Sequence, residues 1–208
     1  MKSLKGGFID TIYIYTADEG LSLAEFKIIC EKRAESMTSD ELKVLNSIRF
    51  KQLKPSPDIL VQKVIPAKDI ENYISGKYKA LKGFISICAD VKQLVAPADF
   101  YYGLRLDYKN SPYCPDDKSV GIIRFRAVNI TSAIIPRTPE NGGEFTDSYP
   151  FGGAGFTTGS QGRSGTPEWV LKEFAVLEEA QIFEIFSDGS EKIRAVYNKE
   201  KDYFEEVI

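Results

Sequence analysis

Residues 181–197 read QIFEIFSDGSEKIRAVY. Two runs in which apolar and polar residues alternate, 181–186 and 191–197, flank Asp188-Gly189. Asp-Gly between two such runs is the strongest short-range signal of a β-hairpin, because these residues accept the positive φ that a tight turn requires. The stretch therefore predicts an antiparallel hairpin, and residues 203–207 are expected to add an edge strand.

Patterns of the same kind precede the hairpin. Apolar and charged residues alternate over 104–108, and a similar alternation over 120–128 predicts a further strand. Shorter apolar runs at 59–65 and 84–87 also have the length and the β-branched content of strands. We expect these segments to form one mainly antiparallel β-body.

The N-terminal third predicts helices together with one strand. Residues 8–15 are rich in β-branched and aromatic side chains, so a strand is expected there. The segments 22–25 and 38–41 read SLAE and TSDE, which is the spacing of a capping box at the start of a helix. Apolar residues recur at helical spacing after each box, so two helices are expected, and a shorter helix is expected over 68–75.

These patterns predict an α+β fold in which a helical N-terminal portion packs on a bent, mainly antiparallel β-body. The composition shift places the boundary between residues 1–66 and 67–208, although a single α+β domain accounts for the same pattern. No internal repeat or heptad pattern is present.

The composition excludes several classes of function. The 208 residues include no histidine, which removes Ser-His-Asp and Cys-His catalysis and histidine metal sites. The three cysteines, Cys30, Cys88 and Cys114, are far apart and form no C-x-x-C, so reduced thiols and no metal site are expected. A net charge of −3 argues against nucleic acid or an anionic membrane as a partner.

The sequence also bears on location. No apolar stretch approaches the roughly 18 residues that a membrane span needs. The first ten residues, MKSLKGGFID, contain two lysines but no apolar region after them, so no signal peptide is expected. We expect the protein to remain in the cytoplasm of the cell that makes it.

A glycine-rich segment is the main compositional anomaly. Residues 141–165 contain eight of the sixteen glycines. Glycines let backbone N–H groups approach a ligand closely, hydroxyl side chains can contact a ribose, and an arginine suits a phosphate. The segment is neither a Walker loop nor a Rossmann fingerprint, and a plain connecting loop remains the alternative. The candidate ligand-binding residues of this segment are Gly155, Phe156, Thr157, Thr158, Ser160 and Arg163.

Charged residues on either side of this segment complete the candidate site. Arg105 and Arg124 lie in strand-like runs, where they would hold an anion or form ordinary cross-strand ion pairs. Glu168 follows the glycine-rich segment beside the only tryptophan, Trp169. A carboxylate there would orient a ribose hydroxyl or stabilise an oxocarbenium-like centre, or it would be an ordinary strand-edge residue.

The order of these features resembles the plan of the ADP-ribosyltransferase-like superfamily, which includes toxin domains that use NAD. In that family a strand arginine holds the dinucleotide, a hydroxyl segment shapes the pocket, and a Glu-x-Glu or Gln-x-Glu segment supplies the catalytic glutamate. Residues 155–160 resemble the hydroxyl segment and 168–171 resemble the glutamate strand. Two departures are that Val170 stands where a second carboxylate is expected and that Gly159 interrupts the hydroxyl triplet.

The resemblance implies a role for each candidate. Arg105, with Arg124 as second choice, would pair with a phosphate of NAD, while Glu168 would stabilise the developing cation at the ribose carbon. NAD would then be a substrate in ADP-ribosyl transfer or in glycohydrolysis, with a nucleotide or small molecule, and in addition a target protein, as partners. The alternative is a non-catalytic protein-binding module, such as a phage, effector-associated or immunity component, because aromatic residues and arginine also anchor interfaces.

Overall fold

A computed structural model describes residues 7–32, 36–136, 153–158 and 163–207 of the chain. Helices lie mostly in the N-terminal part and strands in the rest, which confirms the predicted α+β class. The helices are α1 (Phe8–Asp18), α2 (Leu23–Glu31), α3 (Ser39–Phe50), α4 (Ile70–Ile74) and α5 (Pro97–Gly103). The strands are β1 (Val61–Pro66), β2 (Gly83–Ile87), β3 (Ser119–Ala127), β4 (Trp169–Leu171), β5 (Leu177–Phe186), β6 (Glu191–Asn198) and β7 (Tyr203–Glu206).

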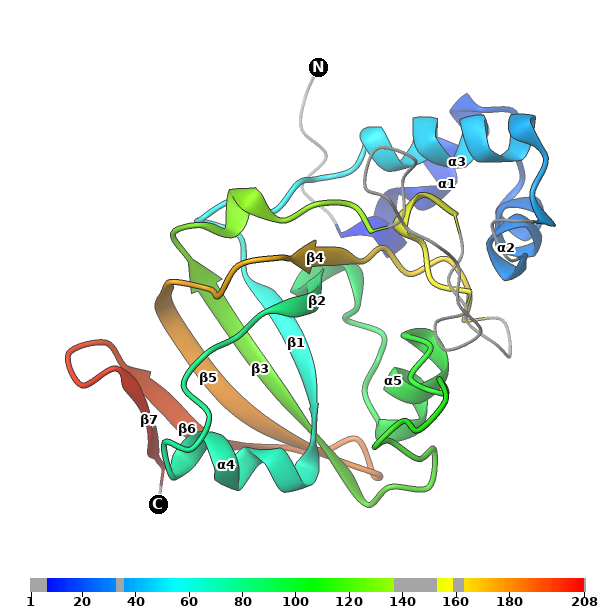
Figure 1. Cartoon of the computed structure of the whole chain (residues 1–208). Helices are drawn as coiled ribbons and strands as arrows, with labels where there is room; N and C mark the ends of the chain where they lie inside the picture. Colours follow the sequence, from blue (N-terminus) through cyan, green and yellow to red (C-terminus); the bar gives the residue numbers. More distant parts are fainter. Residues whose placement is uncertain (1–6, 33–35, 137–152, 159–162, 208) are drawn as a thin grey trace.

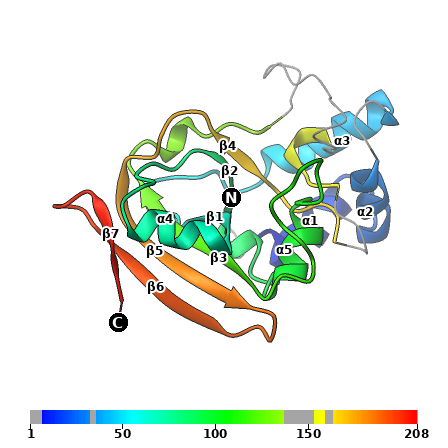
Figure 2. The same cartoon turned by 60° about the horizontal axis from the view of Figure 1, so that its bottom comes forward.

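The strands form one antiparallel sheet in the order β4-β2-β1-β3-β5-β6-β7 (Figures 1 and 2). The predicted hairpin is confirmed as β5 and β6, and the turn between them contains Gly189 with a φ of +81°. The predicted edge strand is confirmed as β7, which pairs with β6. β1 lies between β2 and β3, so a boundary at residue 66 would separate it from both partners.

The sheet divides between β1 and β2. β1 pairs with β3 through six residue pairs, but it pairs with β2 only through Val61 with Ile87 and Gln62 with Ser86. Beyond these pairs β2 pairs with β4 instead. Figure 1 shows β2 and β4 crossing the upper end of β1, β3 and β5 at an angle. This division leaves a gap in the backbone pairing at which side chains from β1, β2 and the start of β4 face one another.

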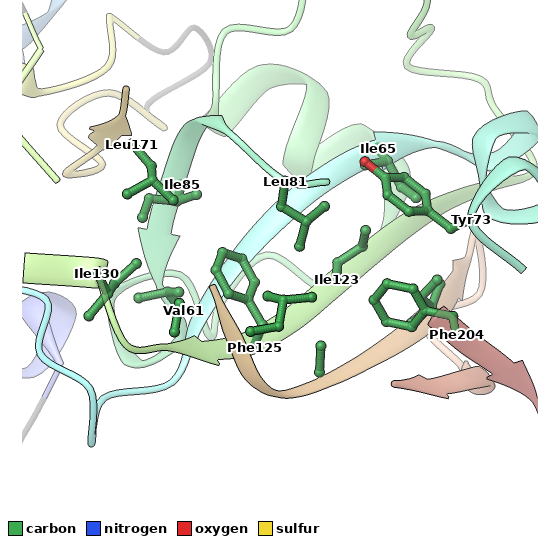
Figure 3. Packing of buried hydrophobic residues seen from close by; sticks show 14 of the residues in the cluster. Val61, Ile65, Tyr73, Leu81, Ile85, Ile123, Phe125, Ile130, Leu171 and Phe204 are labelled. Atoms are coloured by element: carbon green, nitrogen blue, oxygen red, sulfur yellow. The ribbon is translucent and has the colours of Figure 1, made fainter. Parts of the chain in front are cut away.

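Each face of the sheet has its own apolar core, because alternate residues of a strand point to opposite faces. One core includes Val61, Ile123 and Phe125 together with Tyr73 of α4 and Phe204 of β7, and Figure 3 shows these side chains converging. The opposite core joins residues of β3 and β5 to α5. A third core, built around Phe26 and Phe156, holds α1, α2 and α3 together.

Two of the N-terminal helices begin as predicted. The Ser22 hydroxyl accepts the Glu25 N–H while the Glu25 carboxylate accepts the Ser22 N–H, and residues 38 and 41 form the same box before α3. α4 also lies within the predicted helical segment, although it is shorter. These helices are therefore specified by local hydrogen bonds that the sequence pattern reveals.

The predicted strand over residues 8–15 is wrong, because this segment is helix α1. Phe8 and Ile12 lie one helical turn apart and are 5% and 4% exposed in the helical core. The Phe8 N–H donates to the buried Asp90 carboxylate at 2.6 Å, which satisfies a backbone donor at the helix start. Packing and this remote cap outweigh the strand preference of the individual residues.

The predicted strand over residues 104–108 is also wrong. The segment continues from α5 as a turn, in which the Leu104 and Leu106 N–H groups donate to the carbonyls of Phe100 and Tyr101. Arg105 adopts a φ of +53°, which no strand residue has. Leu104 and Leu106 both pack into the core next to α5, so their alternation reflects a turn with two inward side chains.

Candidate functional site

Glu168 lies at the divided part of the sheet, directly before β4. Ile85 pairs with Trp169, so continuing that register by one residue places Glu168 beside Ser86. The Glu168 N–H donates to the Gly155 carbonyl at 2.9 Å, and the Glu168 carbonyl accepts a hydrogen bond from Nη2 of Arg49. The backbone of Glu168 is therefore held from both sides, which fixes the direction of its side chain.

Glycine at position 155 makes the first of these contacts possible. Gly155 has a φ of +72°, and a Cβ atom there would lie 2.6 Å from Cγ2 of Ile135. Only glycine fits both the backbone conformation and the space. Gly155 thus has a structural role through its carbonyl, whatever else it contacts.

A cavity of about 130 Å³ lies at the gap between β1 and β2. Its walls include Gln62, Lys63 and Val64 of β1 and Phe84, Ile85 and Ser86 of β2. Glu168 lines it from the position directly before β4, and the segment after α5 contributes Leu104, Leu106, Tyr108 and Tyr113. The cavity therefore gathers a carboxyl group, an amine, an amide, a hydroxyl and phenols within a mainly buried space.

The side chains of two of these residues form no hydrogen bond with the other residues of the cavity wall in the described part of the chain. Gln62 is 5% exposed, and its Nε2 is buried without a hydrogen bond. No described residue donates a hydrogen bond to the Glu168 carboxyl group, although Glu168 is only 6% exposed. The Tyr113 hydroxyl, in contrast, donates to the Val64 carbonyl at 3.1 Å. Buried polar groups are nearly always hydrogen-bonded in folded proteins, so the Gln62 amide is an exception in the wall of this cavity.

Burial dominates the electrostatics of the cavity. Loss of solvent raises the pKa of Glu168 to about 8, against the opposing effect of Arg49 and Lys63. Loss of solvent also lowers the pKa of Lys63, which Glu168 partly offsets. At neutral pH these surroundings therefore favour a protonated Glu168, and a positive charge brought close to it would favour the ionised form.

Arg49 is the main feature that the sequence analysis did not identify. It is 1% exposed, its guanidinium lies 4.2 Å from the centre of the Trp169 ring, and burial lowers its pKa to about 9 despite the nearby carboxylates of Asp90 and Glu168. It also donates to Oε1 of Gln52. A signal was present, because Arg49 follows Leu45 by four residues and so shares the apolar face of α3.

The two predicted anion-binding arginines lie outside the cavity. Arg105 forms an ion pair with Asp107 at 2.6 Å, although its Nε is buried without a partner and its neighbours Leu104 and Leu106 line the cavity. Arg124 lies on β3 opposite Gln62, where it pairs with Glu191 at 2.9 Å and stacks over the Phe183 ring. Both arginines are engaged in intramolecular pairs.

Residues of the glycine-rich segment mainly hold the structure together. Phe156 is 1% exposed and packs against Phe8 and Phe26 in the helical core. The Thr157 hydroxyl donates to the Gly103 carbonyl at 2.8 Å and accepts the Thr166 N–H at 3.1 Å. These contacts within the protein account for the burial of Phe156 and Thr157.

The remaining candidates of this segment do not line the cavity either. Thr158 is buried, and Arg163 forms an ion pair with Asp99 at 2.8 Å. Ser160 lies outside the described residues. Among the predicted site residues that the structure describes, only Glu168 lines the cavity. Gln62, Lys63 and Ser86, which the sequence analysis did not select, line it as well.

The described residues contain neither a metal-binding cluster nor a helix that could cross a bilayer. In this part of the chain no three cysteine, aspartate or glutamate side chains gather closely enough to hold a metal ion. Among the same residues, no helix has both the length and the apolar character needed to cross a bilayer.

Comparisons with known proteins add no family to this description. A scan against protein-family models, a search of curated proteins and a search of solved structures each found no match.

Proposed function

We propose that the cavity at Glu168 binds the nicotinamide end of NAD and that the protein breaks the nicotinamide–ribose bond, as an ADP-ribosyltransferase or NAD glycohydrolase. One observation carries this proposal. The Glu168 carboxyl group has no hydrogen-bond partner among the described residues and lines a cavity beside Gln62, whose amide donor is also unpartnered. Two neighbouring polar groups without partners are typical of a ligand site rather than of a core.

The chemistry suits a buried carboxylate. When the bond breaks, nicotinamide leaves with the bonding electron pair and the ribose carbon becomes cationic, until water or a nucleophile of a target protein attacks it. The nicotinamide ring of NAD is already positive before cleavage, so its entry would favour the ionised form of Glu168. A fixed carboxylate then stabilises the cation that develops on the ribose.

The size of the cavity limits what it holds. The cavity of about 130 Å³ is smaller than a cavity of about 150 Å³ that holds benzene, so it would take up the nicotinamide ring only in part and leave the rest of NAD outside. The ribose and the phosphates would lie toward the turn after α5. Arg105 is next in sequence to two residues that line the cavity, and its predicted contact with a phosphate remains part of this proposal.

A second function, a non-catalytic protein-binding module, is favoured by one exposed patch. Val128, Phe174 and Val176 are 52%, 56% and 56% exposed, and the Val128 N–H donates to the Val176 carbonyl, so these segments are adjacent. Exposed apolar side chains that gather in this way are typical of protein-contact surfaces.

The test is an NAD titration followed by an assay of nicotinamide release, on the wild-type protein and on Glu168→Gln. We expect saturable binding in the wild type and a loss of about 10²–10³ in turnover in the variant, because one preorganised electrostatic partner is removed. Arg126→Gln is the matched control, since Arg126 lies on the same strand β3 but forms an exposed ion pair with Glu179, and it should retain turnover. Absence of binding at millimolar NAD would overturn the proposal and leave the protein-binding function as the better one.

A further inference from the structure

Lys63 carries an amine that the proposed function does not use. The residue lies on β1, where it pairs with Ile123 of β3, and it lines the cavity together with Glu168. Its side chain is half-buried, yet no ion pair or hydrogen bond joins its amine to another residue in the described part of the chain. Lysines withdrawn from water are nearly always paired, so an unpaired amine at the centre of a sheet is unusual.

The amine reaches across the gap from β1 to β2. Gly83, the first residue of β2, has a φ of +93°, and a Cβ atom there would lie 3.6 Å from Nζ of Lys63. A side chain at this position would therefore contact the amine, whereas glycine leaves the space beside it open. The next residue, Phe84, lines the cavity as Lys63 does. The amine thus lies where β1 and β2 separate, at the cavity.

Glu168 is the acidic neighbour of this amine. The two residues line the same cavity and each influences the pKa of the other, but they form no ion pair. Loss of solvent disfavours the charged form of both, because it lowers the pKa of Lys63 and raises the pKa of Glu168 to about 8. Near pH 7 the cavity therefore favours a neutral amine beside a carboxylic acid more than water does.

The cavity also offers a hydrogen-bond donor for an uncharged ligand. Gln62 precedes Lys63 on β1, lines the same cavity and is 5% exposed, and its Nε2 is buried without a hydrogen bond. Such a donor suits the oxygen of a carbonyl group, which accepts hydrogen bonds without bringing a charge into the buried space. A nucleophile, a proton donor and a donor for the carbonyl oxygen are thus gathered in one cavity.

We infer that Lys63 forms a Schiff base with a small aldehyde or ketone that enters the cavity, and that Glu168 donates the proton this reaction needs. Lysines in desolvated sites are the residues that form such bonds, since the neutral amine is the nucleophile. The volume of about 130 Å³ is below that of a cavity that holds benzene, so the carbonyl compound has a short chain. The reaction uses no NAD, so it goes beyond the proposed function and does not depend on it.

The reaction balances with the groups of the cavity alone. The Lys63 nitrogen attacks the carbonyl carbon, the electron pair of the C=O π bond moves to oxygen, and one proton moves from nitrogen to that oxygen. Glu168 then donates its proton to the resulting hydroxyl, which leaves as water while nitrogen forms a double bond to carbon. The products are an iminium cation and the Glu168 carboxylate, which stabilise each other in a site of low dielectric constant.

The test is reductive trapping of the full chain with propanal and sodium cyanoborohydride at pH 7, without NAD. Cyanoborohydride reduces the imine to a stable secondary amine, and peptide mass spectrometry measures the rate of labelling at each lysine. We expect Lys63 to be labelled at least about tenfold faster than Lys68, an exposed lysine in the turn after β1, because an adjacent general acid accelerates imine formation. Labelling of Lys63 no faster than Lys68 would overturn the inference.

Three variants assign the roles of the residues. Lys63→Arg keeps the positive charge but removes the nucleophile, so the fast labelling should disappear, whereas Lys68→Arg should retain it. Glu168→Gln should slow labelling of Lys63 by about 10² or more, and an unchanged rate would overturn the role of Glu168 as proton donor.

Circular dichroism and the melting temperature show whether each variant is folded, and the rates at individual lysines of the wild type decide the question even if a variant is not. Fast labelling of Lys63 in a protein that fails to bind NAD would support this inference and overturn only the proposed function. NAD binding without preferential labelling would do the reverse.

Discussion

The surroundings of the Glu168 carboxyl group disfavour its ionised form. It is buried at the division of the sheet, and the nearest cations only partly offset the loss of solvent. Arg49 directs a guanidinium N–H to the Glu168 carbonyl rather than to the carboxylate. The protonation state of this one side chain therefore links the stability of the protein to pH.

This arrangement predicts a pH dependence of stability. The folded protein retains the Glu168 proton until about pH 8, whereas the unfolded chain releases it near the usual pKa of 4.5. A rise in pH through this window therefore removes stability, by roughly 3 to 5 kcal/mol in total. Urea unfolding of the wild type and of Glu168→Gln between pH 5 and 9 should show the wild type losing stability relative to the variant.

Asp90 provides an internal check on this experiment. Burial raises its pKa to about 6, so it also lowers stability as the pH rises, but over a lower window and equally in both proteins. The difference between the two proteins isolates Glu168. A difference that stays constant from pH 5 to 9 would show that the pKa of Glu168 is not raised.

At the scale of elements, Arg49 joins α3 to the start of β4. Its guanidinium contacts Gln52, which follows the end of α3. It also contacts the Glu168 carbonyl and the Trp169 ring at the start of β4. We expect Arg49→Leu to lower the free energy of unfolding by about 3 to 5 kcal/mol, because it leaves the Asp90 carboxylate buried without a compensating cation. Denaturant unfolding measures this loss.

Arg49→Lys is the matched variant for this prediction. It keeps a positive charge but lacks the planar group that reaches two acceptors. Its free energy of unfolding should therefore lie between those of the wild type and Arg49→Leu. Equal stability of Arg49→Leu and the wild type would show that Arg49 does not hold these elements together.

The elements that could be predicted are those whose signals are local. The capping boxes before α2 and α3 and the Asp-Gly turn between β5 and β6 depend on residues a few positions apart, and all three are confirmed. Helix α1 depends on a contact between Phe8 and Asp90, which are 82 residues apart in sequence. A local sequence pattern cannot predict a contact over this distance. The cavity was missed for the same reason, because Gln62, Ser86 and Glu168 meet only through strand pairing.

At the scale of the whole molecule, the sheet is strongest at its centre and weakest at its edges. β3 pairs with β1 through six residue pairs and with β5 through nine, and both of its faces are buried in apolar cores. β7 has four residues and one partner strand. Local opening should therefore cost most at β3 and least at β7.

Hydrogen exchange measures this gradient directly. The amides of Ile122 and Ile123, which are fully buried on opposite faces of β3, should exchange slowest, near the rate of global unfolding. The amides of 203–206 should exchange much faster. Equal protection of both strands would contradict the order of strands in the sheet.

The pairing of β4 with β2 also determines when the cavity can form as the protein folds. Arg49 and Glu168 are 119 residues apart in sequence, and β2 and β4 are themselves separated by β3 and the glycine-rich segment. Closing so long a loop is entropically costly, and contacts of this kind form late in folding. During synthesis, a ribosome must complete most of the chain before Glu168 can reach Ser86. A nascent or prematurely terminated chain that ends before β4 therefore carries β1, β2 and β3 without the Glu168 carboxyl group, and the complete cavity arises only after β4 has been made.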